Sequence, residues 1–221
     1  LYVGGDYLFA AIVQDRWLYM CIGDVSGHGV AAALVVARLH GLIRRLTLEN
    51  RARPVTILER VNREAYKLFQ HTYFFMTFGV FRLDMQTKRL RYATAGHPAQ
   101  TLLRKNGEVE LLRTPNRLLG IDSDIFDSKR PSDSVILEPG DSLVLFTDGL
   151  FEIPSGQNGE VLGEEGLYDR IAGMKGLAPS LMAGEILQEL ADYQGHSHVQ
   201  DDVSLMVATW KGGADADEPN G

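Results

Sequence analysis

The sequence predicts an α+β fold, in which mostly antiparallel strands form the sheet and the helices come in separate pairs. Many short apolar runs are joined by tight polar turns, a pattern that indicates β-hairpins. Two stretches, one in each half of the chain, instead repeat their apolar residues at helical spacing. Because strands and helices are grouped and do not alternate one by one, the pattern favours helices segregated from an antiparallel sheet.

The composition allows one sizeable globular core or at most two small domains. The 221 residues are 45% hydrophobic and 23% charged, a balance typical of a folded domain. The formal net charge is -7 and no basic run is present, which argues against a nucleic-acid partner. Cys21 is the single cysteine, so an intramolecular disulfide framework is excluded, and its apolar neighbours predict a core position.

The sequence has no features of a secreted or membrane protein. No apolar run reaches the roughly 18 to 20 residues of a membrane-spanning helix, and no signal peptide stands at the start. The first residue is Leu1 rather than Met, and the opening residues have the character of a strand interior. We therefore expect a fragment of a longer, cytoplasmic protein with no membrane partner.

The first predicted hairpin brings two acidic residues together. Its strands are residues 7–13 and 17–23, joined by the polar connection Gln14-Asp15-Arg16. Antiparallel pairing of these runs places Asp6, at the outer end of the first strand, near Asp24, at the outer end of the second. The hairpin thus gives a geometric reason to expect a site at this end of the sheet.

A glycine-rich turn follows the second strand. Residues 22–30 read Ile-Gly-Asp-Val-Ser-Gly-His-Gly-Val and separate the strand from a helix. Glycine permits backbone conformations and close approaches that other residues do not. A carboxylate in this turn can therefore point into a site, although a tight turn with a solvated Asp24 would also explain the stretch when it is taken alone.

The remaining elements follow in the order two helices, several hairpins, two helices and a strand. Helical spacing predicts helices over about 30–50 and 54–69, and again over about 165–174 and 179–192. Apolar runs between polar turns predict strands at residues 74–83, 89–95, 100–104, 109–112, 135–137, 142–146 and 203–210. The tail from residue 212 onwards is small, polar and acidic, and we expect it to be disordered.

Acidic residues fall at the ends of four predicted strands: Asp6, Asp24, Asp148 and Asp201, with Asp202 beside the last. Gathered carboxylates repel one another unless a cation lies among them. Oxygen ligands without Cys or a His pair favour Mg²⁺ or Mn²⁺ over Zn²⁺, and two such ions can activate water for phosphoryl transfer. Each Asp taken alone is also explained as a turn former.

Several motifs together carry a resemblance to a known family. They are Gly5-Asp6-Tyr7, the Gly23 to Gly29 turn, Ala95-Gly96-His97-Pro98, Thr147-Asp148-Gly149 and Asp201-Asp202. In order and spacing they resemble the bacterial PPM/PP2C-type serine phosphatases of the SpoIIE/RsbU branch, along nearly the whole chain. The resemblance implies an α+β, four-layer α/β/β/α sandwich of two mostly antiparallel sheets flanked by helix pairs. It assigns residues 1–211 to this domain and leaves 212–221 as the acidic tail.

The resemblance also implies a function in bacterial signal transduction. The domain would be a phosphatase dependent on two Mg²⁺ or Mn²⁺ ions, hydrolysing phosphoserine or phosphothreonine on a partner protein. The expected partner is a phosphorylated STAS-type anti-sigma-factor antagonist, and an upstream sensor or receiver domain would control the output. The nucleophile would be a metal-bridging water, so no protein nucleophile is required.

The family pattern assigns roles to five positions of this sequence. Asp24 would bridge both metal ions, and Val25 would supply its backbone carbonyl. Asp6 would complete one metal site with these two residues, and Asp148 and Asp201 would complete the other. Catalysis by Asp24, Asp148 and Asp201 would therefore act through metal-activated water.

Three further residues receive supporting roles. Asp202 would lie just outside the ligand shell, although the order of Asp201 and Asp202 is left open. Eukaryotic relatives carry a His two places after the bridging Asp, where this chain has Ser26, so His28 is expected to orient the turn. For His97 we expect a turn or core position instead of a catalytic one.

Two other functions remain open on the sequence alone. A catalytically weak, phosphatase-like adaptor would bind a regulatory partner without turnover, although the complete set of acidic positions argues against it. A metal-dependent phosphodiesterase or nuclease is disfavoured by the acidic balance and the lack of a basic groove. The sequence does not decide whether the protein forms a homodimer.

Overall fold

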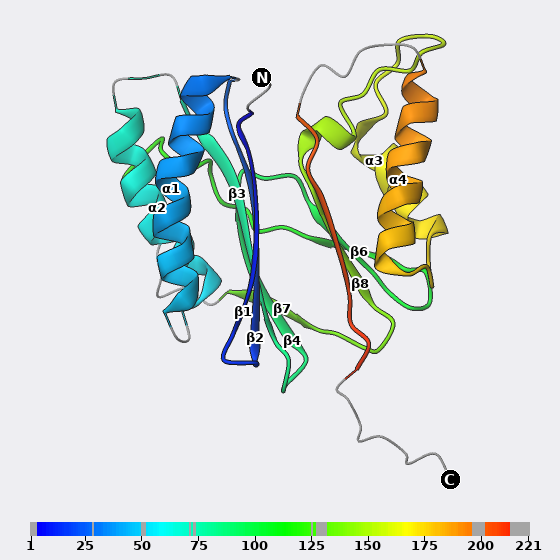
Figure 1. The fold of residues 1–221 in the computed structure, drawn as a ribbon, viewed down its shortest axis with the longest axis horizontal. Helices are drawn as coiled ribbons and strands as arrows, with labels where there is room; N and C mark the ends of the chain where they lie inside the picture. Colours follow the sequence, from blue (N-terminus) through cyan, green and yellow to red (C-terminus); the bar gives the residue numbers. More distant parts are fainter. Residues whose placement is uncertain are drawn as a thin grey trace.

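Two antiparallel sheets stack face to face, and a pair of helices covers the outer face of each (Figure 1). The computed structural model describes residues 4–27, 29–49, 52–70, 72, 74–124, 126, 132–195 and 202–212. The layers run helix pair, sheet, sheet, helix pair. This is the α/β/β/α sandwich that the family resemblance implies.

In the described part of the chain, the first sheet has five strands in the order β1-β2-β3-β4-β7, and every neighbouring pair is antiparallel. Its strands are β1 (Asp6–Val13), β2 (Trp17–Val25), β3 (Met76–Asp84), β4 (Arg89–Ala95) and β7 (Asp133–Ile136). The β1–β2 hairpin turns through Gln14 and Asp15, both with positive φ. The predicted first hairpin is therefore confirmed.

The described residues of the second sheet form four strands in the order β6-β5-β8-β9, again all antiparallel. Its strands are β5 (Gln100–Leu103), β6 (Val109–Leu112), β8 (Ser142–Phe146) and β9 (Leu205–Thr209). The chain passes from the first sheet to the second between β4 and β5, over residues 96–99. A short 3-10 helix, η1 (Asp148–Leu150), follows β8.

Helices α1 (Val30–Leu48) and α2 (Pro54–Phe69) pack on the first sheet, and α3 (Gly163–Gly173) and α4 (Pro179–Gln194) pack on the second. Proline opens both α2 and α4, where its missing N–H costs no helical hydrogen bond. No helix in the described part of the chain is long and apolar enough to cross a membrane.

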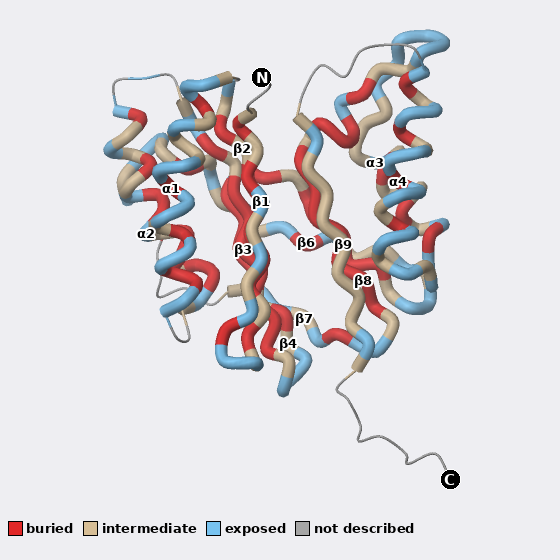
Figure 2. The backbone as a smooth tube through the Cα atoms, viewed as in Figure 1, coloured by how far each residue is buried: buried red, intermediate tan, exposed pale blue. Residues whose placement is uncertain are grey.

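The described residues form three apolar clusters, which lie between the four layers. Figure 2 shows buried residues along the strands between the two helix pairs. Strand β2 shows how one run serves two of them. Tyr19 and Cys21 face the α1–α2 side, whereas Met20 and Ile22 face the second sheet. Both faces are buried, which explains the continuous apolar run and confirms the core position of Cys21.

The observed boundaries differ from the predicted ones by a few residues. Strand β3 begins at Met76 instead of Phe74. The Phe75 N–H donates to the side-chain hydroxyl of Ser26 at 3.0 Å and so does not take part in strand pairing. Strand β7 begins two residues earlier than predicted. Of the predicted tail, residues 213–221 lie outside the described part, so its disorder stays a prediction.

Candidate metal-binding edge of the two sheets

The β1–β2 hairpin sets the first half of the site. Asp6 lies directly opposite Asp24 in the register, and the Val25 N–H donates to the Gly5 carbonyl at 3.1 Å. A side chain at Gly5 would overlap the Val25 carbonyl oxygen and lie 2.7 Å from Asp24 Oδ1. Only glycine lets the chain pass this close, so Gly5 brings its backbone against two of the predicted ligands.

Thr147 joins the second sheet to this hairpin. Its hydroxyl donates to Asp6 Oδ2 at 2.8 Å and accepts the Ser204 N–H at 3.0 Å. The Thr147 N–H donates to the Ser204 carbonyl at 3.1 Å. One buried threonine thus holds the end of β8 and the approach to β9 against β1, which puts Asp148 at the same edge as Asp6.

Asp202 completes the described cluster of acids. A side chain at Gly4 would overlap the Asp202 carboxylate, and one at Gly149 would overlap the Asp202 backbone carbonyl. Asp202 therefore lies between the start of β1 and the turn that carries Asp148. The four acids are all half-buried, so this edge stays open to solvent on one side: Asp6, Asp24, Asp148 and Asp202.

The charges of this edge perturb one another. Burial raises the pKa of Asp6, and the negative charges of Asp202 and Asp148 raise it further, while hydrogen bonds from Ser204 and Thr147 oppose the shift. Repulsion of this kind is relieved by a cation among the carboxylates. Oxygen atoms alone make up the donor set, which fits Mg²⁺ or Mn²⁺. Even so, among the described residues no three His, Cys, Asp or Glu side chains lie close enough to hold an ion.

The predicted site residues divide into two groups. The structure brings Asp6, Asp24 and Val25 together and holds Asp148 and Asp202 beside Asp6. His28 and Asp201 lie outside the described residues. The ligand roles, including the choice between Asp201 and Asp202, therefore stay predictions.

Two threonines at this edge were missed by the sequence reasoning. Thr77 on β3 accepts the Asp24 N–H at 3.2 Å through its hydroxyl, and the same oxygen lies 2.9 Å from His97 Nδ1. Thr147 was noticed only as part of a motif. Both are polar residues beside apolar strand runs, and this pattern could have identified them as candidate site residues. His97 is buried, as predicted.

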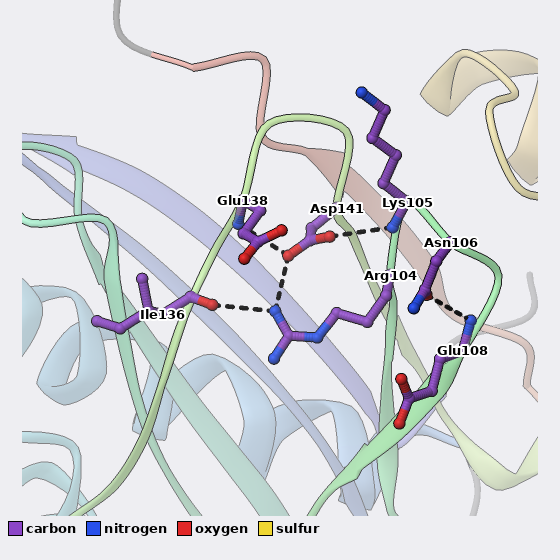
Figure 3. Close-up of a pocket in the computed structure, with 7 residues that line it drawn as sticks. All are labelled: Arg104, Lys105, Asn106, Glu108, Ile136, Glu138 and Asp141. Carbon is purple, nitrogen blue, oxygen red and sulfur yellow. Dashed lines mark hydrogen bonds and ion pairs between the residues drawn. The ribbon is translucent and has the colours of Figure 1, made fainter.

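A second group of charges lies at the opposite end of β8, around a cavity of about 580 Å³ (Figure 3). The buried carboxylate of Asp141 accepts from Arg104 at 2.8 Å and from the N–H groups of Lys105 and Glu138. Arg104 also donates to the Ile136 carbonyl at 2.9 Å. These bonds tie β7 of the first sheet to β5 and β8 of the second, so this group is a structural clamp.

A family model decides the classification of the chain. Residues 14–211 match the model described as Stage II sporulation protein E (SpoIIE). The chain belongs to the SpoIIE family. The match begins at the turn after β1 and runs to just beyond the end of β9, so it includes strands of both sheets and the four α-helices of the described residues.

Two bacterial phosphatases are similar to the chain in sequence. The chain is 28% identical to the phosphoserine phosphatase RsbP of Bacillus subtilis over 153 residues, covering 68% of the chain and 37% of RsbP. It is 28% identical to the phosphoserine phosphatase RsbU of the same organism over 214 residues, covering 93% of the chain and 59% of RsbU. The chain thus spans only part of either relative.

Among solved structures, the SiaA PP2C domain of Pseudomonas aeruginosa superposes with a TM-score of 0.83 at 23% identity. The superposition covers 95% of this chain and 84% of the SiaA chain. At this level of identity the likeness establishes the PP2C fold and no more.

Proposed function

We propose that this SpoIIE-family domain is a metal-dependent protein serine/threonine phosphatase. The observation that carries the proposal is the Thr147–Asp6 hydrogen bond, which joins the acids of the first sheet to those of the second. Asp24 and Asp148, which are distant in sequence, come to one solvent-facing edge as a result. The relatives RsbP and RsbU, both phosphoserine phosphatases, point to the same chemistry.

The proposed ligands form two overlapping sets. Asp24, the Val25 carbonyl and Asp6 would hold one ion, and Asp24, Asp148 and Asp201 would hold the other, with Asp202 and His28 in support. When bound, the two ions would lower the pKa of water and neutralise charge on the phosphoryl group. The protein's part is to orient these oxygens: Gly5 gives the close approach, and Thr147 favours the ionised form of Asp6 by donating to it.

Water is the proposed nucleophile. It attacks phosphorus in line with the serine or threonine oxygen of the substrate, so that the phosphorus–oxygen ester bond breaks as the new bond to water forms. Phosphate and the free hydroxyl side chain are the products. No side chain becomes phosphorylated in this scheme.

The partner is proposed from the family branch. We expect a phosphorylated STAS-type anti-sigma-factor antagonist as substrate, in the cytoplasm. Because the chain spans only part of RsbP and RsbU, we also propose an upstream sensor or receiver domain that controls the activity.

Phosphate release from a phosphoserine peptide by the purified chain tests the activity. We expect release that needs Mn²⁺ or Mg²⁺, stops on addition of a chelator, and falls about 10³-fold in Asp148→Asn. Asp169→Asn, which changes an exposed acid on α3, is the matched control. Activity that survives both the chelator and Asp148→Asn would sink the proposal, and preferential cleavage of bis(p-nitrophenyl) phosphate would indicate a phosphodiesterase.

The phosphatase-like adaptor is the alternative function. A protein of this kind would bind the phosphorylated partner tightly and release no phosphate. The same assay, combined with a binding measurement, separates the two functions.

A further inference from the structure

The crossover from β4 to β5, residues 96–99, carries the chain between the two sheets beside the proposed metal site. Two buried polar side chains lie at this crossover: His97 is within it, and Gln100 follows it at the start of β5. Burying a polar group lowers stability unless it is hydrogen-bonded. The partners of these two side chains therefore indicate what the crossover does.

His97 is connected to Asp24 through one hydroxyl group. Thr77 Oγ1 accepts the Asp24 N–H at 3.2 Å and lies 2.9 Å from His97 Nδ1. Since the hydroxyl oxygen is the acceptor toward Asp24, its single hydrogen is available for His97 Nδ1. The same oxygen can also accept from Nδ1, so this hydrogen bond forms with either neutral tautomer of the ring, and His97 Nε2 has no hydrogen-bond partner among the described residues. Burial lowers the pKa of His97 to about 4, although the Phe146 backbone carbonyl opposes this shift, so the neutral form dominates near pH 7.

Gln100 is connected to the other half of the site. Its side-chain oxygen accepts the Phe146 N–H at 2.6 Å, and its side-chain nitrogen donates to the Phe146 carbonyl at 3.1 Å. Both backbone groups of Phe146 are thereby held, two residues before Asp148. The crossover and the start of β5 are thus connected to the Asp24 backbone through Thr77 and to the backbone of Phe146, two residues before Asp148.

We infer that His97 and Thr77 are a positioning pair, which fixes the backbone of Asp24 relative to Asp148 across the two sheets. The inference rests on the proposed function, because Asp24 and Asp148 are the proposed metal ligands. Neither His97 nor Thr77 touches the substrate in this account. They set how well the site binds metal by holding Asp24 and Val25 at the right distance from the second sheet.

A purely structural role for the pair has different consequences. If His97 and Thr77 only filled the core, their loss would lower stability and leave metal affinity unchanged in the folded protein. A positioning pair changes metal affinity even where stability is preserved. The effect of a substitution also depends on its chemistry and not only on its size, because the Thr77 hydroxyl makes the contacts with both Asp24 and His97.

The test compares Thr77→Val, Thr77→Ser and His97→Asn by two measurements on the full chain. Mn²⁺ affinity is measured by calorimetric titration, and protection of the Asp24 amide by hydrogen exchange. Valine keeps the shape of threonine but loses the hydroxyl, so we expect about 10-fold weaker Mn²⁺ binding and faster exchange at Asp24. Serine keeps the hydroxyl and Asn keeps an acceptor near Nδ1, so both are expected to stay within about 3-fold of wild type.

Thr101→Val is the matched control. Thr101 is a buried threonine on β5 whose hydroxyl has no hydrogen-bond partner among the described residues, so we expect wild-type metal binding. His97→Leu should weaken binding as Thr77→Val does, and the double variant no further, because both act through one hydroxyl. If His97→Leu does not fold, the serine–valine comparison at Thr77 decides alone.

The outcomes distinguish this inference from the proposed function. Thr77→Val with wild-type Mn²⁺ affinity and a protected Asp24 amide would overturn the positioning pair while leaving the phosphatase intact. A wild-type chain that binds Mn²⁺ but releases no phosphate would overturn the phosphatase, and the affinity comparison would still test the pair. Weaker binding in Thr77→Val, restored by serine, supports it.

Discussion

The two ends of β8 carry buried or half-buried aspartates in opposite electrostatic settings. At the start of the strand, Asp141 is buried and accepts hydrogen bonds from the Arg104 guanidinium and two backbone N–H groups. Beyond the end of the strand, Asp148 lies among other acids, and its charge raises the pKa of Asp6. The comparison teaches that charge balance, and not the presence of Asp, separates a structural carboxylate from a functional one.

The largest expected effect belongs to the acidic end. Asp148→Asn should reduce phosphate release by about 10³-fold, because a neutral amide is a poor ligand for a hard cation. The same change removes one repelling charge, so the metal-free variant should unfold at the same temperature as wild type or higher. Kinetic assays with Mn²⁺ and calorimetric unfolding with a chelator check the two halves of this prediction.

The Asp141 end of β8, where the carboxylate is paired with Arg104, should respond in the opposite way. Arg104→Met leaves the Asp141 carboxylate buried without its cation, which should cost about 3 kcal/mol of unfolding free energy. Activity of the folded fraction should stay within about 3-fold of wild type, because the clamp lies at the far end of β8.

Denaturant unfolding measures this cost, with the exposed Arg117→Met as the control. A loss of activity that exceeds the loss of folded protein would show that the two ends of β8 are coupled. It would contradict the separation of a structural end from a functional one.

Asp84 is a second aspartate paired with an arginine, and this pair should make the stability of the protein depend on pH. Arg16 donates to its carboxylate at 2.8 and 3.0 Å and lowers the pKa of Asp84 to about 2. Because this pKa is depressed on folding, the ion pair stabilises the protein above about pH 4, and the stabilisation is lost as the pH falls from about 4 to 2.

Asp84→Asn should therefore be less stable than wild type by about 2 kcal/mol at pH 7 and nearly equal to it at pH 2. Denaturant titrations at several pH values measure the difference. A difference that stays constant from pH 7 to pH 2 would contradict the ion-pair explanation.

The smallest effect is expected at Thr147, where the two sheets meet. Thr147→Val removes the hydrogen bond to Asp6 and should raise the Mn²⁺ concentration for half-maximal activity about 10-fold. Thr147→Ser keeps the hydroxyl and should behave as wild type. Equal metal requirements in the serine and valine variants would remove Thr147 from the functional end.

Much of the first half of the site was predictable from local sequence. The polar turn at residues 14–16 joins two apolar runs, and a turn this short fixes the register that puts Asp6 opposite Asp24. Helices and strands followed from the spacing of apolar residues, with errors of a few residues at their ends. Hairpin and helix geometry is local, so one sequence is enough to derive it.

The second half was not predictable in the same way. The Thr147–Asp6 hydrogen bond joins residues 141 positions apart, and the Thr77–His97 contact depends on how β3 meets the crossover. Such contacts follow from the stacking of two sheets, which no local pattern encodes. The resemblance to a family supplied the acids of this half, and the roles of Asp201 and His28 stay predictions.

Mn²⁺-dependent phosphate release in Asp24→Asn and Arg104→Met, measured side by side on a phosphoserine peptide, tests the central claim most directly. The account predicts that Asp24→Asn loses metal-dependent release while keeping its stability, and that Arg104→Met loses stability while keeping its release. Wild-type release in Asp24→Asn, or release that does not depend on Mn²⁺, would contradict the assignment of the acidic edge as a phosphatase site.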